Sequence, residues 1–192
     1  NAGSALASGV IAASAFVVTN TAAAAAALTW TFLSWAENRK PSAMAAATGA
    51  VCGLVAITPA SGFVGPIAAL AIGIIAGVVT YAAVYIRMHK IGIDDTLDVW
   101  AAHGIGGLVG AVLTGVFAEK AINAAGNNGL LFGNSNQLAI QIIAVAVVAL
   151  YSFIGTWLIL KLISFFSPLR VSSSQESQGL DLAVHGEAGY RL

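Results

Sequence analysis

The chain has 192 residues, of which 58% are hydrophobic and only 8% are charged, and its formal net charge is zero. A soluble domain carries about a quarter charged residues, so this chain cannot cover a water-facing surface with polar groups. A neutral chain also lacks the basic surface that nucleic-acid binding requires. The composition therefore predicts an all-α, polytopic membrane helix bundle in contact with membrane lipid, and excludes nucleic acid as a partner.

Long uncharged stretches separate small clusters of charged residues and define the predicted spans. A spanning helix needs about 20 predominantly apolar residues. The stretch before Glu37 fits one such helix, whereas the next uncharged stretch, residues 41–86, is too long for one. The sequence TPASGFVGP, with two prolines and two glycines, divides it. The predicted helices cover roughly residues 9–35, 42–58, 64–87, 97–118 and 137–166.

Residues 1–168 form the predicted transmembrane domain, and Pro168 and a Ser/Gln-rich run introduce a tail over 169–192. Because the chain begins in an apolar stretch without a methionine, we expect it to be the C-terminal part of a longer protein. Five spans would place seven basic residues on one side and only Lys120 on the other. The positive-inside rule then predicts a cell-membrane protein with a cytoplasmic C-terminus. The seven are Arg39, Lys40, Arg87, Lys90, Lys161, Arg170 and Arg191.

His103 is the only ionisable residue between Asp98 and Glu119. It follows Asp98 by five residues, which places it about 8 Å along a helix. A polar side chain at such depth is expensive and usually faces a bundle interior or a pathway. Helical spacing puts it on one face with Val99, Gly107 and Gly110, a narrow apolar face that suits passage of a small molecule. The alternative is a buried histidine bonded to a carbonyl of a neighbouring helix.

Other chemistry finds little support in the sequence. No second histidine, cysteine or carboxylate stands near His103 at metal-ligand spacing, and the single Cys52 fits a small buried residue. The glycines of residues 104–110 have the wrong spacing for a dinucleotide loop. No nucleophile triad or carboxylate pair is visible, so we expect no enzyme, no metal and no cofactor. Asp94, Asp95 and Asp98 suit the N-terminus of a helix, and of the three we expect Asp98 to have a structural role inside the protein. Isolated hydroxyls such as Ser4 and Thr58 usually satisfy backbone groups.

Four segments resemble the ammonium transporter family (Amt/MEP/Rhesus) in the family's order. They are NAGSA at the start, ATGAVCGLVAITPASGFVGP at 47–66, DDTLDVWAAHGIGGLVGAVLTGVFA at 94–118 and GLDLAVHGEAGY at 179–190. The resemblance covers essentially the whole chain. It implies an eleven-helix fold with two inverted halves, assembled as a homotrimer with one pore per subunit. This sequence would then supply the end of helix six through helix eleven and the cytoplasmic tail.

The resemblance also implies roles for individual residues. His103 matches the second histidine of a pair in the middle of the pore, and Val99 and Val51 match apolar pore-lining positions. Ser4 matches the serine of the external recruitment site, and Thr58 matches a threonine near that vestibule. Asp98 matches a carboxylate just before the helix turn of the second histidine. The tail motif, with which a PII-type signal protein interacts in the family, is matched by Gly179, Asp181, His185, Gly186 and Glu187.

These matches predict transport of ammonium, which would be recruited outside, deprotonated, and conducted as ammonia past a histidine pair. The partner histidine and the aromatic residues of the recruitment site and gate would belong to upstream sequence. One alternative is an ammonium sensor that signals through the tail, which a direct flux measurement would separate from a transporter. Another is a cofactor-binding bundle, which would need a second ligand beside His103.

Overall fold

The computed structural model describes residues 1–190, all helical or irregular, with no strand among them. The chain divides into two compact units, Asn1–Ala146 and Val147–Leu192, which are described separately. The main helices are α1 (Val10–Asn38), α2 (Ala43–Ile57), α3 (Pro66–Ile86), α4 (Gly106–Phe117), α5 (Ser135–Ser164) and α6 (Ser173–Gln178). Shorter segments are 3₁₀-helical at Ala2–Ala5 and Leu130–Phe132, and π-helical at Arg87–Ile91, Trp100–Ile105 and Asp181–His185.

The apolar composition of the helices confirms the expected membrane architecture. Four helical segments of the described chain are long and apolar enough to cross a bilayer, namely Val10–Asn38, Pro66–Ile91, Trp100–Phe117 and Ser135–Ser164. The fifth predicted helix, α2, has 15 residues. A helix of that length spans about 22 Å, less than the hydrocarbon core, so α2 is a shorter apolar helix between longer ones.

Local sequence signals set the helix ends. The hydroxyl of Ser42 accepts a hydrogen bond from the Ala45 backbone N–H at 3.2 Å and so caps the start of α2. Pro66 occupies the first turn of α3, where its missing N–H costs nothing. Arg39 closes α1 in the left-handed region at φ 60°, with its N–H bonded to the Trp35 carbonyl.

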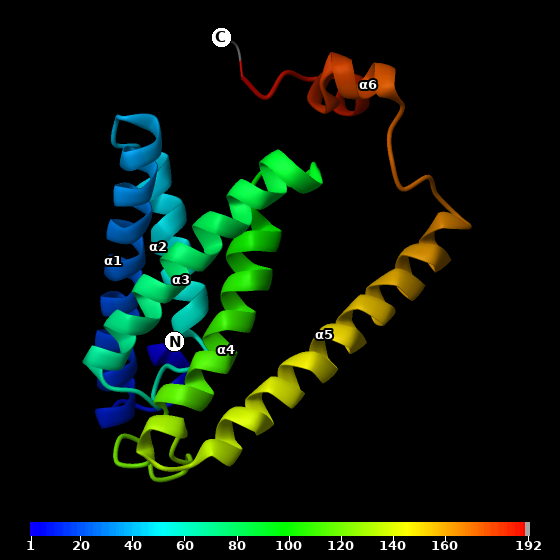
Figure 1. Ribbon diagram of the computed structural model, residues 1–192. Helices are drawn as coiled ribbons and strands as arrows, with labels where there is room; N and C mark the ends of the chain where they lie inside the picture. Colours follow the sequence, from blue (N-terminus) through cyan, green and yellow to red (C-terminus); the bar gives the residue numbers. More distant parts are fainter. Residues whose placement is uncertain (191–192) are drawn as a thin grey trace. The chain divides into compact units, whose positions relative to one another are not determined.

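Within the first unit, α1 to α4 pack side by side, and α1 and α3 run opposite to α2 and α4 (Figure 1). Glycines allow the closest approaches. A Cβ at Gly53 would lie 2.5 Å from the Ala22 carbonyl oxygen, and one at Gly49 would lie 2.5 Å from the Trp30 Cβ. Small residues four positions apart on α2 therefore let its backbone rest against α1.

Two groups of buried residues fill the space between these helices. One group includes Val18, Ala22, Ala56 and Ile72, and the other is built around Trp30. The indole of Trp30 donates a hydrogen bond to the buried hydroxyl of Thr80 at 3.0 Å. The buried indole N–H and the Thr80 hydroxyl thus have partners, as burial in an apolar environment requires.

The loops after α1 and α3 meet at one end of the first unit. Tyr81 of α3 donates to the carboxylate of Glu37, and Arg87 forms an ion pair with Asp98 at 2.8 Å. This arrangement matches the alternation of spans on which the sidedness prediction rests. Which side of the membrane this end faces stays a prediction, and Arg191, counted in that prediction, lies outside the described residues.

Candidate functional site

The imidazole of His103 lies on an exposed face of the first unit. Val99, one turn earlier on the same helical stretch, is 50% exposed, and Val51 of α2 is 40% exposed. Helices α2 and α4 run in the same direction, and a Cβ at Gly107 would lie 3.8 Å from the Val55 side chain. His103 precedes Gly107 by four residues, and Val51 precedes Val55 by four, so His103 and Val51 are inferred to lie at the same level. We call the surface formed by Val51, Val99 and His103 the apolar wall.

The ring of His103 makes no hydrogen bond or ion pair with any residue from 1 to 190. Val51 and Val99, the other two residues of this wall, are aliphatic. A histidine held in a core by a neighbouring carbonyl would be buried, whereas this one is exposed. Within residues 1–190, no neighbouring helix supplies the carbonyl that the alternative of a buried histidine requires. Both ring nitrogens are available to a ligand or to another polypeptide segment.

The helical stretch that carries His103 begins with an unusual backbone. Residues Trp100–Ile105 form a π-helical turn, which is wider than an α-helical turn. The carboxylate of Asp95 accepts hydrogen bonds from the N–H groups of Val99 at 2.9 Å and Trp100 at 2.8 Å. Asp95 is therefore the residue that caps this helix.

Asp98 directly precedes the helix, but its carboxylate has another partner. Its backbone adopts the left-handed region at φ 55°, and its side chain pairs with the Arg87 guanidinium at 2.8 Å. Arg87 also donates to the Ile93 carbonyl at 3.1 Å. The ion pair thus joins the end of α3 to the start of the His103 helix. The sequence favoured Asp98 among the three aspartates for a structural role, but it did not indicate Arg87 as its partner or Asp95 as the cap.

The predicted face of Val99, His103, Gly107 and Gly110 does not stay together along the helix. Gly110 is buried, and its Cα packs against the backbone of Ala56 on α2. Gly110 is therefore packed against α2, whereas His103 is exposed. The π-helical turn changes the angular spacing of the residues that follow it. Gly110 itself packs closely against the backbone of α2.

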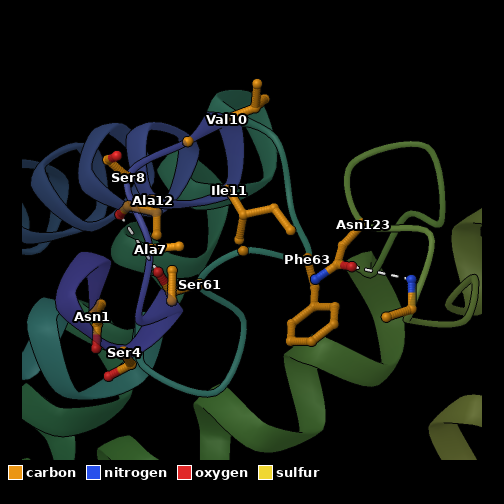
Figure 2. A pocket seen from close by; sticks show the side chains of 15 residues that line it. Asn1, Ser4, Ala7, Ser8, Val10, Ile11, Ala12, Ser61, Phe63 and Asn123 are labelled. Carbon is orange, nitrogen blue, oxygen red and sulfur yellow. Dashed lines mark hydrogen bonds between the residues drawn. The ribbon is translucent and has the colours of Figure 1, made fainter.

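A second polar region lies at the opposite end of the first unit. A cavity of about 590 Å³ is bounded by the Ala2–Ala5 segment, the start of α1, and the loops around Phe63 and Asn123. Figure 2 shows Asn1, Ser4 and Ser61 together on one side of this cavity, with Phe63 and Asn123 on the other. The hydroxyl of Ser4 is exposed and has no hydrogen bond to residues 1–190. We call this region the Ser4 pocket.

Thr58 lies outside the lining of the Ser4 pocket. Its hydroxyl donates to the Leu54 carbonyl one turn earlier at 2.7 Å. A threonine in a helix commonly satisfies its hydroxyl in this way, by donating to the carbonyl four residues earlier. The structure does not bring Thr58 together with Ser4 in one cavity.

The tail motif has an internal structure of its own in the second unit. Gly179 and Gly186 adopt positive φ values of 94° and 73°, a conformation that favours glycine. Between them, the Asp181 carboxylate accepts a hydrogen bond from the Gly189 N–H at 3.0 Å. This bond lowers the pKa of Asp181. The loop closure persists above the ordinary carboxylate pKa and is lost as the pH falls through the lowered value.

Residues His185 and Glu187 of the same motif carry no side-chain hydrogen bond or ion pair within the part of the chain that the structure describes. Their side chains are exposed. Within the motif, Gly179, Asp181 and Gly186 set the backbone path, and His185 and Glu187 are presented by it. No group of three or more potential metal ligands occurs among the described residues.

Comparison with known proteins identifies the family. A family model described as the Ammonium Transporter Family matches residues 1–190. The chain belongs to the ammonium transporter family. An ammonium transporter of Bacillus subtilis is 47% identical over 191 residues, which are 100% of this chain and 47% of that protein. The ammonium transporter Amt1 of Archaeoglobus fulgidus is 47% identical over 190 residues, 99% of this chain and 48% of the relative.

Solved structures of the family have the same fold. The crystal structure of Candida albicans Mep2 superposes with a TM-score of 0.84 at 34% identity, covering 91% of this chain and 40% of that one. A structure described as a sensor Amt protein gives a TM-score of 0.84 at 33% identity, covering 96% and 44%. The chain spans about half the length of the curated relatives that it matches. It is an all-helical, membrane-embedded part of the ammonium transporter fold.

Proposed function

We propose that this chain supplies one wall of a pore that transports ammonium across a membrane as ammonia. The observation that carries the proposal is the imidazole of His103, exposed among aliphatic side chains and without a partner in residues 1–190. An unpartnered polar group at membrane depth is costly and marks a pathway. A ring with one donor and one acceptor suits ammonia, which can both donate and accept hydrogen bonds.

The physical basis of the mechanism is desolvation. A bare cation in an apolar pore costs several kcal/mol or more, whereas neutral ammonia costs far less. Ammonium would give its proton to water or a hydrogen-bonded group at the entrance, and ammonia would then pass Val99, Val51 and His103. In this proposal His103 is one of a pair, its partner being supplied by polypeptide outside residues 1–192.

Recruitment of the cation is assigned to the Ser4 end. The free hydroxyl of Ser4 offers an oxygen acceptor to an N–H of ammonium in a cavity whose lining carries no charged side chain. Aromatic faces would add cation–π attraction to such a site. Thr58, whose hydroxyl is engaged by Leu54, would contribute to the vestibule only through its shape.

The test is uptake of labelled methylammonium by cells that lack their own ammonium uptake and express the full-length gene product containing residues 1–192. We expect His103→Ala to lower the uptake rate at least about tenfold, or to abolish discrimination between ammonium and potassium. His89→Ala is the matched control. Its ring is also exposed, but it donates to the Tyr85 carbonyl at 2.9 Å and stacks on Tyr85, away from the apolar wall. Unchanged uptake and unchanged selectivity in His103→Ala would overturn the proposal.

We also propose that the protein works as a homotrimer with residues 169–192 in the cytoplasm, where a PII-type signal protein would meet the tail. The glycine-shaped loop closed by Asp181 supports a defined binding surface, with His185 and Glu187 presented outward. Ending the chain at residue 170 is expected to lower uptake several-fold at equal protein in the membrane. Full activity of the shortened protein would argue against coupling between tail and pore.

The second candidate function is an ammonium sensor that signals through this tail. A solved relative described as a sensor Amt protein, similar over 96% of the chain, is the observation that favours it. The uptake assay separates the two functions. A transporter shows saturable flux that depends on His103, whereas a pure sensor binds ammonium and shows no flux.

A further inference from the structure

Three hydroxyl and amide side chains from distant parts of the chain form a hydrogen-bonded series beside the Ser4 pocket. The Asn1 side-chain amide donates to the Thr19 hydroxyl at 3.0 Å. The Thr19 hydroxyl lies 3.4 Å from that of Ser61, which in turn donates to the Ala15 carbonyl at 3.4 Å. Thr19 therefore accepts from Asn1 and donates to Ser61, so that each hydroxyl uses its single proton once.

The series joins elements that nothing else ties together by side-chain bonds. Asn1 begins the short 3₁₀ helix Ala2–Ala5, Thr19 lies on α1, and Ser61 lies in the turn between α2 and α3. The bond from Asn1 to Thr19 spans 18 positions in sequence, and that from Thr19 to Ser61 spans 42. Thr19 and Ser61 are both partly buried, so water competes less for the bond between them than at an open surface, whereas the bond from Asn1 to Thr19 is exposed.

The segment that carries Ser4 has few other anchors. None of its four helical residues is buried, and its ends have no side-chain cap. Its internal bonds are short-range, from the Ser4 N–H to the Asn1 carbonyl and from the Leu6 N–H to the Gly3 carbonyl, both at 3.1 Å. Among residues 1–9, the described structure contains one side-chain hydrogen bond, the one from Asn1 to Thr19. That bond is therefore the one side-chain hydrogen bond that joins the Ser4 helix to α1, against which the helix also packs.

We propose that Thr19 is a positioning residue for ammonium recruitment: through Asn1 it fixes the orientation of the Ser4 hydroxyl, with Ser61 as its support. The inference rests on the proposed function of Ser4 and adds residues to which the family resemblance gives no role. Loss of the Thr19 hydroxyl frees the amide of Asn1 and lets the short helix rotate. The recruiting oxygen is then less often in place, which weakens binding of the cation and leaves the later passage of ammonia unchanged.

Thr21 offers a matched control two residues further along α1. Its hydroxyl donates to the Val17 carbonyl of its own helix at 2.9 Å, and it belongs to no series between elements. Thr19→Val and Thr21→Val remove the same atom from the same helix. A general effect of valine on α1 would appear in both variants, whereas a positioning effect would appear only in the first.

The experiment measures initial rates of methylammonium uptake against concentration in the full-length gene product, normalised to the amount of protein in the membrane. We expect Thr19→Val to raise the apparent KM about three- to tenfold, with the maximal rate within about twofold of the parent. Thr19→Ser keeps the hydroxyl and restores the parental KM. Ser61→Ala produces a smaller rise in KM, because it removes only the hydroxyl to which Thr19 donates and leaves the bond from Asn1 to Thr19.

A combined variant distinguishes positioning from a separate structural effect. If Thr19 acts through Ser4, then Ser4→Ala already removes the benefit, and adding Thr19→Val raises KM no further. Additive effects, an unchanged KM in Thr19→Val, or equal effects in Thr21→Val would each overturn the positioning role. Absence of any saturable uptake by the parent protein would instead overturn the proposed function, so the two failures are distinct.

Discussion

The two faces of α2 differ in how closely the rest of the described chain approaches them. On one face, Gly49 and Gly53 let the backbone of α1 approach so closely that a Cβ at either position would overlap it. On the other face, Val51 is 40% exposed and stands level with the unpartnered His103 of the neighbouring helix. Small residues therefore mark where helices meet, and an exposed apolar side chain beside a lone imidazole marks the surface left for a ligand.

The largest effect should come from filling the packed face. A valine at Gly53 would place its Cβ 2.5 Å from the Ala22 carbonyl oxygen and 2.8 Å from the Ala26 Cβ, both on α1. We expect Gly53→Val to lower the free energy of unfolding by about 3 kcal/mol. The measurement is thermal unfolding of the purified protein in detergent. Gly155→Val is the control, because nothing in the described chain lies within 4 Å of a Cβ there. Equal stability of the two variants would contradict the assignment of the packed face.

The next prediction concerns the open face of the same helix. A tryptophan at Val51 would project from the exposed wall without meeting a packed neighbour, so the stability should stay near that of the parent. Because the bulky ring would narrow the proposed pathway, we expect Val51→Trp to lower methylammonium uptake about tenfold. Ile67→Trp, at a position of α3 that is 87% exposed, should leave uptake unchanged. Parental uptake in Val51→Trp would remove this face from the pathway.

The smallest effect is expected from a polar group on the packed side. Trp30→Phe removes the indole that donates to Thr80 inside the bundle and should cost about 1 kcal/mol of stability. Thr80 still donates to the Ala76 carbonyl, so its proton keeps a partner. Trp35→Phe serves as control, because Trp35 lies on the same helix and is 48% exposed. Uptake should not change in either variant, in contrast to His103→Ala. A selective loss of uptake in Trp30→Phe would contradict the assignment of Trp30 to packing alone.

Much of the helical arrangement was predictable because local features determine it. Residues 135–164 form one helix within two residues of each predicted end, since an uninterrupted apolar stretch between polar loops allows little else. The turn before Pro66 and the start of α2 after Ser42 follow from proline and hydroxyl capping chemistry in the same way. Val51, Val99 and His103 are exposed in the structure, and their assignment to a pore wall stays a prediction.

The arrangement of polar partners was less predictable, because it depends on residues that are distant in sequence. Among three aspartates within five residues, the sequence favoured Asp98 for a structural role, but it did not indicate that Asp95 caps the helix or that Asp98 binds Arg87. Which carboxylate faces the guanidinium depends on where α3 ends relative to the next helix. The bond from Asn1 to Thr19 is equally invisible in the sequence, since asparagine and threonine are common and carry no spacing signal over 18 positions.

The sequence by itself determined that this protein is a membrane helix bundle with a lone histidine on an apolar stretch, because hydrophobicity summed over about 20 residues fixes each span. The tertiary structure decided that the histidine is exposed, that Gly110 is buried against Ala56, and that Asn1 donates a hydrogen bond to Thr19. These outcomes depend on the close contact of helix backbones and on a π-helical turn. Both arise only when separate segments pack against one another, so no local pattern encodes them.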